Sequence, residues 1–292
     1  MNRRGFLKTG STALAASALL QSAPATAANQ STAKAKKRIG IQLYSLRDDM
    51  AKDPEGTLRK VAEIGYSTIE TYGYNNGLFF GKKPKEFAAF TNSLGMKMTS
   101  SHTGQAYTKE TEGEVMAWWD KCIETHNQLG VKYIIQPWLP VNDQTTLDDI
   151  KMYCDYFNTV GYKTASASIA FGYHNHDFEF RKIDGQIIYD FMLNNVSKNH
   201  VFFEADVYWI MKGGYNPVDY MRDYADQIRV LHIKDEKEIG ASGEMDFQAI
   251  FEQAKANNIK DWYVEVERYT NENPVESVQQ SFDYLNNAAY VY

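Results

Sequence analysis

The chain has 292 residues, of which 43% are hydrophobic and 23% are charged, with 19 glycines and 7 prolines. This ordinary globular composition excludes a disordered, collagen-like or disulfide-stapled protein. The formal net charge is −6, and an acidic protein repels nucleic acid and anionic lipid at long range. We therefore expect no nucleic-acid partner.

The first residues contain the three parts of an export signal. Arg3, Arg4 and Lys8 precede an apolar run over 12–20, and small residues follow at Ala25-Thr26-Ala27. The apolar run is too short to span a membrane permanently. The paired arginines, followed by Phe-Leu-Lys, are similar to a twin-arginine signal, which implies export of a folded protein.

We therefore expect a twin-arginine signal peptide over 1–28 and a flexible leader over 29–37. The predicted location is the periplasm. No later segment approaches the about 18 uncharged apolar residues that a membrane-spanning helix needs, so we expect no membrane span.

From residue 38 onward, short apolar segments alternate with longer segments whose apolar residues recur every three or four positions. The short segments are rich in β-branched and aromatic residues and are bounded by turn residues, which is typical of strands. The longer segments have the spacing of amphipathic helices. The eight predicted strands are 39–44, 67–70, 97–101, 133–136, 169–174, 201–206, 229–233 and 262–267.

Eight strands that are each followed by a helix predict a single (β/α)8 TIM barrel of the α/β class over 38–292. No linker rich in proline or serine divides this part of the chain. The alternative α/β fold is a doubly wound sheet that binds a nucleotide. It is disfavoured because no Gly-x-Gly-x-x-Gly motif follows any predicted strand.

Polar residues gather where the predicted strands end, which is where the active site of such a barrel lies. Interior positions elsewhere along the strands are apolar, so this convergence of acids and imidazoles predicts a functional site. The residues at or just after the strand ends are Tyr44, Glu70, His102, Gln136, His174, His176, Asp206, His232, Lys234, Glu265 and Glu267.

Carboxylates and imidazoles without a thiolate suit one divalent metal ion, with Mn, Co or Zn favoured over Ca. Such an ion polarises a sugar carbonyl or hydroxyl, and a flanking carboxylate or imidazole can remove a proton from the neighbouring carbon. Glu204 and Asp206 share one face of their strand. We expect Asp206 to reach the ion and Glu204 to close the barrel layer below it.

Five motifs together are similar to those of the sugar phosphate isomerase/epimerase family, the xylose isomerase-like TIM barrels. The resemblance covers nearly all of 38–290, and it is specific for the superfamily rather than for a substrate. The motifs lie at 40–48, 173–180, 206–209, 231–235 and 264–265.

The resemblance implies four metal ligands, which fall on His174, Asp206, His232 and Glu265. The first is a departure, because the family's ketose epimerases have Glu at the position of His174. The imidazole removes one negative charge and the symmetric proton exchange between two carboxylates. A neutral histidine still binds metal, and its pKa near neutrality suits a base.

The same resemblance implies the remaining roles. Glu265, His174 or His176 would supply the base, and Lys234 would stabilise the charge of an enolate. The residues expected to contact sugar hydroxyls or to stack on the ring are Tyr44, Glu70, His102, Glu179 and Trp209.

The sequence therefore predicts a metal-dependent isomerase or epimerase that acts on a free, non-phosphorylated sugar or sugar derivative by proton abstraction next to a carbonyl. Export and the acidic rim argue against a phosphorylated substrate. A lyase or dehydratase acting on a keto-sugar or 3-keto-glycoside is the alternative. A non-catalytic periplasmic carbohydrate-binding protein is the alternative from another class. The endonuclease IV branch of the superfamily is disfavoured by the acidic composition.

Two further expectations concern cysteines and aromatic residues. Cys122 and Cys154 fall in helical segments and predict buried thiols rather than a disulfide. Trp118 and Trp119 are expected to be exposed, where they could support a homo-oligomer interface.

Overall fold

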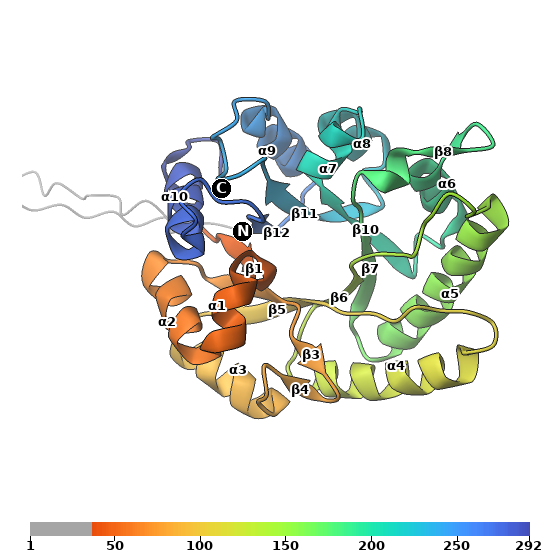
Figure 1. The fold of residues 1–292 in the computed structure, drawn as a ribbon, viewed down its shortest axis with the longest axis horizontal. Helices are drawn as coiled ribbons and strands as arrows, with labels where there is room; N and C mark the ends of the chain where they lie inside the picture. The colour runs from red at the N-terminus through yellow and green to blue at the C-terminus, as the bar shows by residue number, and fades with distance from the viewer. Residues whose placement is uncertain (1–36) are drawn as a thin grey trace, which may run out of the picture. The chain divides into compact units, whose positions relative to one another are not determined.

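Eight parallel strands close into a barrel in the order β1-β12-β11-β10-β7-β6-β5-β2, and helices surround it (Figure 1). This computed structural model describes residues 37–292. The predicted TIM barrel is confirmed. The predicted signal peptide over 1–28, and the predicted leader over 29–37 except Lys37, lie outside the described residues.

The barrel strands coincide closely with the predicted ones. Their bounds are β1 (Gly40–Gln42), β2 (Thr68–Thr71), β5 (Lys97–His102), β6 (Tyr133–Gln136), β7 (Ala170–His174), β10 (Val201–Asp206), β11 (Ile228–Lys234) and β12 (Asp261–Glu265). The first strand is shorter than expected, because the Gln42 side chain accepts a hydrogen bond from the Tyr44 N–H at 3.0 Å. This bond begins the 3-10 helix η1 (Leu43–Leu46), so Tyr44 follows the strand instead of ending it.

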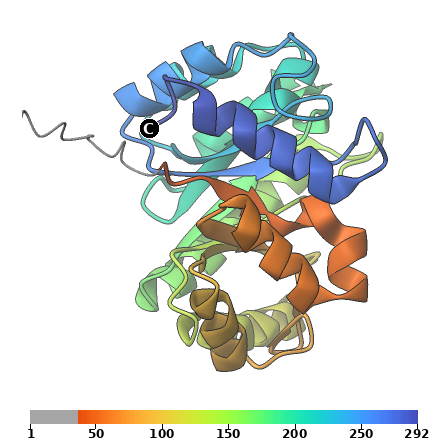
Figure 2. The ribbon, with the colours of Figure 1, turned by 90° about the vertical axis from the view of Figure 1, so that its left-hand side faces the viewer.

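Each barrel strand is followed by at least one helix. The helices are α1 (Arg47–Lys52), α2 (Pro54–Ile64), α3 (Pro84–Ser93), α4 (Glu112–Asn127), α5 (Leu147–Ser166), η2 (Phe178–Phe180), α6 (Ile188–Asn195), α7 (Val207–Lys212), α8 (Pro217–Asp223), α9 (Phe247–Ala256) and α10 (Pro274–Asn287). The last helix, α10, packs against α2 and so closes the ring of helices (Figures 1 and 2). No helix in the described part of the chain is both long enough and apolar enough to cross a membrane.

Two hairpins are inserted after strands of the barrel. The first, β3 (Tyr74–Asn75) with β4 (Leu78–Phe79), follows β2, and the second, β8 (Lys182–Ile183) with β9 (Gln186–Ile187), follows β7. Both insertions leave from the carboxyl ends of their strands. They therefore lie in connections that can shape an active site.

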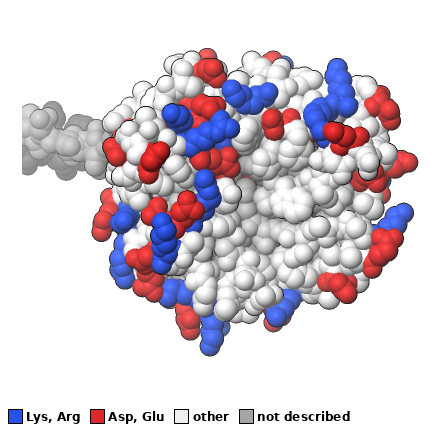
Figure 3. All heavy atoms as spheres, in the orientation of Figure 1, with Lys and Arg blue, Asp and Glu red and all other residues white. Residues whose placement is uncertain are grey.

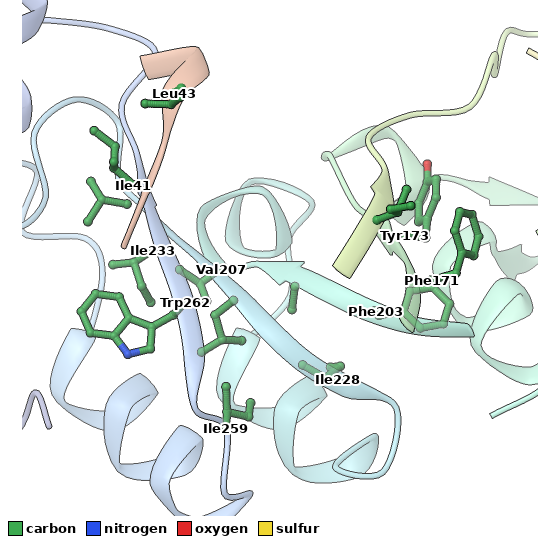
Figure 4. Close-up of a cluster of buried hydrophobic side chains, with 14 of the residues drawn as sticks. Ile41, Leu43, Phe171, Tyr173, Phe203, Val207, Ile228, Ile233, Ile259 and Trp262 are labelled. Carbon is green, nitrogen blue, oxygen red and sulfur yellow. The ribbon is translucent and has the colours of Figure 1, made fainter. Parts of the chain in front are cut away.

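The strands separate two apolar layers, because alternate side chains point in opposite directions. Outward-facing residues pack against the helices, and Figure 4 shows part of this layer, including Ile41, Ile233 and Trp262. Inside the barrel, a smaller cluster of Ile135, Phe202, Val230 and Tyr263 forms an apolar plug below the strand ends. On three of these strands a polar residue follows two positions later on the same face, namely Glu204, His232 and Glu265.

The plug depends on a glycine in β7. A Cβ atom on Gly172 would lie 2.6 Å from the ring of Phe202, closer than real contacts allow. Glycine at this position therefore makes room for an aromatic ring in the centre of the barrel.

One aromatic prediction is wrong. Trp119 is fully buried, and its Nε1 donates a hydrogen bond to Tyr156 Oη at 2.6 Å. Trp118 is partly buried and packs edge-on against Tyr74, with ring centres 5.6 Å apart. The spacing of α4 turns Trp119 into the core, so this ring is not available to a subunit interface, whereas Trp118 keeps part of its surface exposed. The cysteine prediction agrees with the structure, since Cys122 and Cys154 are free and buried.

Candidate metal centre and active site

The strand register brings the predicted polar residues together at the carboxyl end of the barrel. Asp206 on β10 lies opposite His232 on β11, and Lys234 on β11 lies opposite Glu265 on β12. Because all the strands are parallel, these neighbouring pairs point into the barrel at similar depths. Adjacent strand ends thereby build one continuous polar cluster above the apolar plug.

His232 lies at the centre of this cluster. Its Nε2 is 2.7 Å from Glu70 Oε1, while its Nδ1 is 3.3 Å from Glu265 Oε2 and 3.9 Å from Asp206 Oδ2. The ring is therefore positioned to donate from Nε2 to Glu70 and to offer the Nδ1 lone pair to a metal. A carboxylate behind a metal-binding histidine is the usual way to fix the tautomer of such a ligand.

The four predicted metal ligands lie together. One ligand atom from each of His174, Asp206, His232 and Glu265 lies within 4.8 Å of the others, and all four residues are buried. Among the described residues, no hydrogen-bond partner is found for Asp206 Oδ2 or His174 Nδ1. Buried polar atoms are normally satisfied, so these two atoms fit a site built for a cation. We call these four residues the metal-ligand set.

A second group overlaps with this set and includes a residue that the sequence did not place there. His102, His174, Glu204 and His232 also have ligand atoms within 4.8 Å of one another. Glu204 Oε2, however, lies 2.6 Å from His102 Nε2 and 3.2 Å from His232 Nε2. This oxygen also lies 3.4 Å from His174 Nδ1, whereas Glu204 Oε1 has no hydrogen-bond partner among the described residues. Glu204 therefore fits either a supporting role below the metal-ligand set or a ligand position in the second group.

Burial and charge perturb the acids of this cluster. Burial raises the pKa of Asp206 to about 7. Burial, together with the nearby Glu70, raises the pKa of Glu204 to about 7. Burial would lower the pKa of His232, but Glu204 and Glu265 raise it well above its usual value. Burial therefore disfavours the ionised forms of Asp206 and Glu204, and a cation bound beside them would favour those forms.

A divalent ion would supply that positive charge. The donor set of two imidazoles and two carboxylates fits Mn, Co or Zn better than Ca, which prefers oxygen ligands. Burial lowers the pKa of His174 well below its usual value, which keeps its imidazole neutral and available as a ligand. The residues present thus fit the metal that the sequence predicts.

Lys234 is oriented by two carboxylates. Its Nζ lies 3.0 Å from Glu265 Oε2 and 2.9 Å from Glu267 Oε2, and it lies over the ring of Trp209 at 5.3 Å. Burial would lower the pKa of Lys234, but Glu265 and Asp206 raise it above its usual value. The ammonium group is therefore charged, and it holds the Glu265 carboxylate in place.

A cavity of about 540 Å³ opens above the cluster. In Figure 3, which shows one face of the molecule, the middle is hollowed and is surrounded mostly by residues other than Lys, Arg, Asp and Glu. The residues lining the cavity are Tyr44, Tyr72, Tyr74, His102, Thr103, Gly104, Pro137, Trp138, His174, His176, Glu265 and Glu267. The cavity therefore reaches two members of the metal-ligand set, His174 and Glu265.

The predicted sugar-contacting residues divide into two groups. Tyr44 and His102 line the cavity, as expected for substrate contacts. Glu70 and Glu179 are fully buried and do not line it. Trp209 does not line it either; it is partly buried below, beside Lys234.

Hydrogen bonds to nearby residues account for the burial of Glu70 and Glu179. Glu70 accepts hydrogen bonds from Gln42 Nε2 and Ser100 Oγ as well as facing His232. Glu179 accepts from Tyr173 Oη at 2.5 Å and from the His176 N–H at 2.8 Å. Direct contact with sugar is therefore corrected to a supporting role for both, Glu70 behind His232 and Glu179 behind His176.

Asn175 is a supporting residue that the sequence analysis passed over. Its side-chain oxygen accepts a hydrogen bond from the Asp206 N–H at 3.1 Å, so it joins the ends of β7 and β10. Its position between two predicted site histidines was a signal that could have pointed to it. The contact fixes the backbone from which the Asp206 side chain projects.

The fold and this cluster define a TIM barrel with a candidate divalent-metal centre at the carboxyl ends of its strands. A sequence profile of the xylose isomerase-like TIM barrel family matches residues 58–288. The chain belongs to this family.

Known proteins of the same fold include several carbohydrate enzymes. A sugar phosphate isomerase/epimerase from Parabacteroides distasonis ATCC 8503 is 38% identical, with a TM-score of 0.83 over 88% of this chain and 100% of that one. A 3-keto-D-glucoside 4-epimerase from E. coli shares the fold at 22% identity, with a TM-score of 0.68 over 87% of this chain and 100% of its own. An inosose dehydratase from Geobacillus kaustophilus is 23% identical over 219 residues, 68% of this chain and 69% of its own length.

These likenesses confirm the predicted enzyme class at a coarse level. The chain is an enzyme of the isomerase/epimerase type, with lyase chemistry as the alternative within the same fold.

Proposed function

We propose that this protein is a metal-dependent isomerase or epimerase of a free, non-phosphorylated sugar or sugar derivative, and that it removes a proton from the carbon next to a carbonyl. The observation that carries the proposal is the metal-ligand set, whose ligand atoms lie within 4.8 Å of one another. Two of its members line a cavity of about 540 Å³, a size that suits a small-molecule substrate.

The metal-ligand set provides candidates for the two parts of the reaction, polarising the sugar oxygen and removing the proton. A divalent ion held by the set would polarise a sugar carbonyl or hydroxyl oxygen. Glu265 lines the cavity and is the candidate base. Burial would raise the pKa of Glu265, but Lys234 and His232 lower it well below its usual value. The carboxylate is therefore ionised, which a base requires, and its low pKa makes it a weak proton acceptor while Lys234 and His232 remain charged beside it.

His176 is the candidate for a second proton-transfer group. It lines the cavity, and burial lowers its pKa to about 4, so the ring is neutral at pH 7. Its backbone N–H is held by Glu179, and its ring stacks on Phe178 with centres 5.5 Å apart. The ring is thus held in one orientation, as an acid–base group requires.

The lining of the cavity supports a substrate without phosphate. Among the described residues that line it, there is no Lys or Arg, and the acids are Glu265 and Glu267. Phosphate groups are usually bound by Arg, Lys or backbone N–H groups at a helix start. Two carboxylates would instead repel a phosphorylated sugar.

A lyase acting on a keto-sugar or 3-keto-glycoside is the second candidate. It is favoured by the asymmetry of the cavity, where the candidate proton-transfer groups are one carboxylate, Glu265, and the neutral imidazoles of His174 and His176. Such an arrangement suits removal of a proton on one side, followed by loss of a leaving group instead of return of the proton. The likeness to an inosose dehydratase points the same way.

We also propose export to the periplasm, which rests on the Arg3-Arg4 motif. Replacement of both arginines by lysine should leave the protein in the cytoplasmic fraction of a bacterial host with twin-arginine export. Normal recovery of that variant from the periplasm would contradict the proposal.

The proposed function is tested by metal analysis and proton NMR. We expect the purified protein to bind about one Mn, Co or Zn ion per chain, and to incorporate deuterium from deuterated water into a sugar or keto-sugar. An intact carbon skeleton indicates an isomerase or epimerase, whereas an unsaturated product or a released aglycone indicates a lyase. Sugar binding that needs no metal and gives no exchange would favour a carbohydrate-binding protein.

A further inference from the structure

The outer part of the cavity is lined by four aromatic residues, Tyr44, Tyr72, Tyr74 and Trp138, which we call the aromatic wall. They come from η1, from the connection between β2 and β3, from β3 itself and from the connection after β6. Tyr44 is 40% exposed and Trp138 is 42% exposed, although both rings are large and apolar. Rings left open to solvent beside a cavity indicate a surface for a ligand.

The tyrosines of the aromatic wall are held in place by contacts with neighbouring side chains and backbone. Tyr72 packs edge-on against Tyr44 with ring centres 5.3 Å apart, and its hydroxyl donates to the Arg47 carbonyl at 3.2 Å. Tyr74 packs against His126, with ring centres 4.9 Å apart. These rings present a rigid surface, so ligand binding does not incur the conformational-entropy cost of ordering them.

Trp138 is anchored through its backbone. The buried side chain of Gln136 donates from Nε2 to the Trp138 carbonyl at 2.9 Å. The same side chain fills the space beside Gly104, where a Cβ atom would lie 1.8 Å from Gln136 Oε1. Gln136 therefore fixes two connections that line the cavity without itself reaching it.

The cavity is larger than a single sugar needs. Its volume of about 540 Å³ lies within the range of about 300–1,000 Å³ typical of pockets that hold drug-sized ligands. A hexose, with about 12 non-hydrogen atoms, is smaller than such ligands. A sugar at the metal-ligand set would thus leave the aromatic wall uncovered, with room for a further group.

The chemistry of the wall limits what that group is. The lining residues of the cavity include no Lys or Arg within the described chain, and its acids lie at the strand ends. A flat, neutral ring fits aromatic side chains best, since its apolar face packs on theirs.

We propose that the substrate is a glycoside whose reacting sugar carries a ketone carbonyl and lies at the metal-ligand set, and whose attached group is a neutral ring that packs on the aromatic wall. A second sugar ring and an aromatic aglycone share this chemistry. The placement of the reacting sugar rests on the proposed function. The ring-binding role of the wall does not, because it follows from the shape and lining of the cavity.

Calorimetric titration of the full chain with unreactive glucosides in the presence of Mn²⁺ tests this inference. The ligands are methyl and phenyl glucosides of both anomers, together with methyl maltoside and methyl cellobioside. Burial of an added ring should tighten binding about tenfold relative to the methyl glucoside. A preference for phenyl glucosides alone identifies an aromatic aglycone, and a preference for the disaccharides alone identifies a second sugar.

Two variants attribute the preference to the wall. Trp138→Ala and Tyr44→Ala should each reduce the preference to about twofold or less, since each removes a partly exposed ring that lines the cavity. Tyr162→Ala is the matched control, because Tyr162 is a 64% exposed tyrosine on α5 that does not line the cavity. Its preference should equal that of the unaltered protein.

The inference is overturned if no ring-bearing ligand binds more tightly than the methyl glucosides, or if the preference survives both wall substitutions. Its failure is separate from that of the proposed function. A ring preference without deuterium exchange in any sugar would contradict the proposed function and leave the subsite standing. Deuterium exchange without a ring preference would contradict the ring-binding role of the aromatic wall and leave the proposed function standing.

Discussion

His232 links Glu70 to the candidate metal ligands through the two nitrogens of one ring. Its Nε2 lies 2.7 Å from Glu70 Oε1, while its Nδ1 faces Glu265 Oε2 at 3.3 Å. Glu70 is held in turn by Gln42 and Ser100. The orientation of a candidate metal-ligand imidazole is thus set by a network of residues on the first three strands of the barrel, β1, β2 and β5.

This link predicts that Glu70 affects metal binding without contacting the metal. Glu70→Gln keeps the shape of the side chain but removes the charge that orients the His232 ring. We expect the affinity for Mn²⁺ to fall about tenfold or more, as is typical when a supporting carboxylate is lost, and calorimetric titration measures it. Glu63→Gln, at an exposed position of α2, is the control. An unchanged affinity in the Glu70 variant would show that the network does not support the ligand.

A second prediction concerns Glu265, the candidate base. Glu265→Gln should slow deuterium incorporation by a factor of about 10² to 10⁴, the range typical of acid–base groups. Lys234 retains Glu267 at 2.9 Å, so the fold should survive, which circular dichroism can check. Because Glu265 is also a candidate ligand, metal content must be measured in the same samples.

Glu267→Gln is the matched control for that experiment. Glu267 contacts the same ammonium group and also lines the cavity, but it lies outside the metal-ligand set. We expect a loss of less than about tenfold. Normal exchange in the Glu265 variant would rule out Glu265 as the base.

The sequence was sufficient to predict the barrel and the gathering of polar residues at its rim because both depend on local patterns, whereas the assignment of four of these residues to a metal rests on the family resemblance. Strands such as β10 and β11 have mainly apolar residues in their first half and acids or imidazoles near their carboxyl ends. Parallel strands in a barrel all end at the same rim, so these polar residues meet there whichever strands are neighbours. Asp206, His232 and Glu265 could therefore be placed together before their distances were known.

The supporting residues could not be assigned in this way, because their roles depend on contacts across the barrel. Glu179 follows a site histidine closely in sequence, yet it turns inward to Tyr173 and the His176 backbone. Glu204 lies two residues before Asp206 on the same face, and only the closed barrel brings it to His102. Residues of the aromatic wall such as Tyr72 and Trp138 lie in connections between elements, where no periodic pattern marks them.

The buried carboxyl group of Glu179 predicts a pH-dependent stability. Burial raises the pKa of Glu179 to about 8, whereas its unfolded value is about 4.3. Between these values the folded protein keeps a proton that the unfolded chain has lost. The free energy of unfolding should therefore fall as the pH rises from about 4.3 to 8, and this contribution should be lost above pH 8.

Glu179→Gln tests this contribution. The amide can still accept from the His176 N–H and donate to Tyr173 Oη, but it does not titrate. We expect the decrease in unfolding free energy between pH 5.5 and 7.5 to be smaller in the variant by on the order of 1–3 kcal/mol. Urea denaturation at the two pH values measures the difference. Identical pH profiles would mean that Glu179 is ionised in the folded protein.

The last prediction concerns the apolar plug that supports the site. Gly172→Ala places a Cβ atom 2.6 Å from the Phe202 ring, so the ring must shift within a closed barrel. We expect a loss of about 1–3 kcal/mol in the free energy of unfolding, the usual cost of overpacking. Gly113→Ala is the control, because a Cβ there meets nothing within 4 Å and Gly113 lies in α4. It should stabilise the protein by about 0.5–1 kcal/mol, and equal effects of the two substitutions would show that the plug tolerates a methyl group.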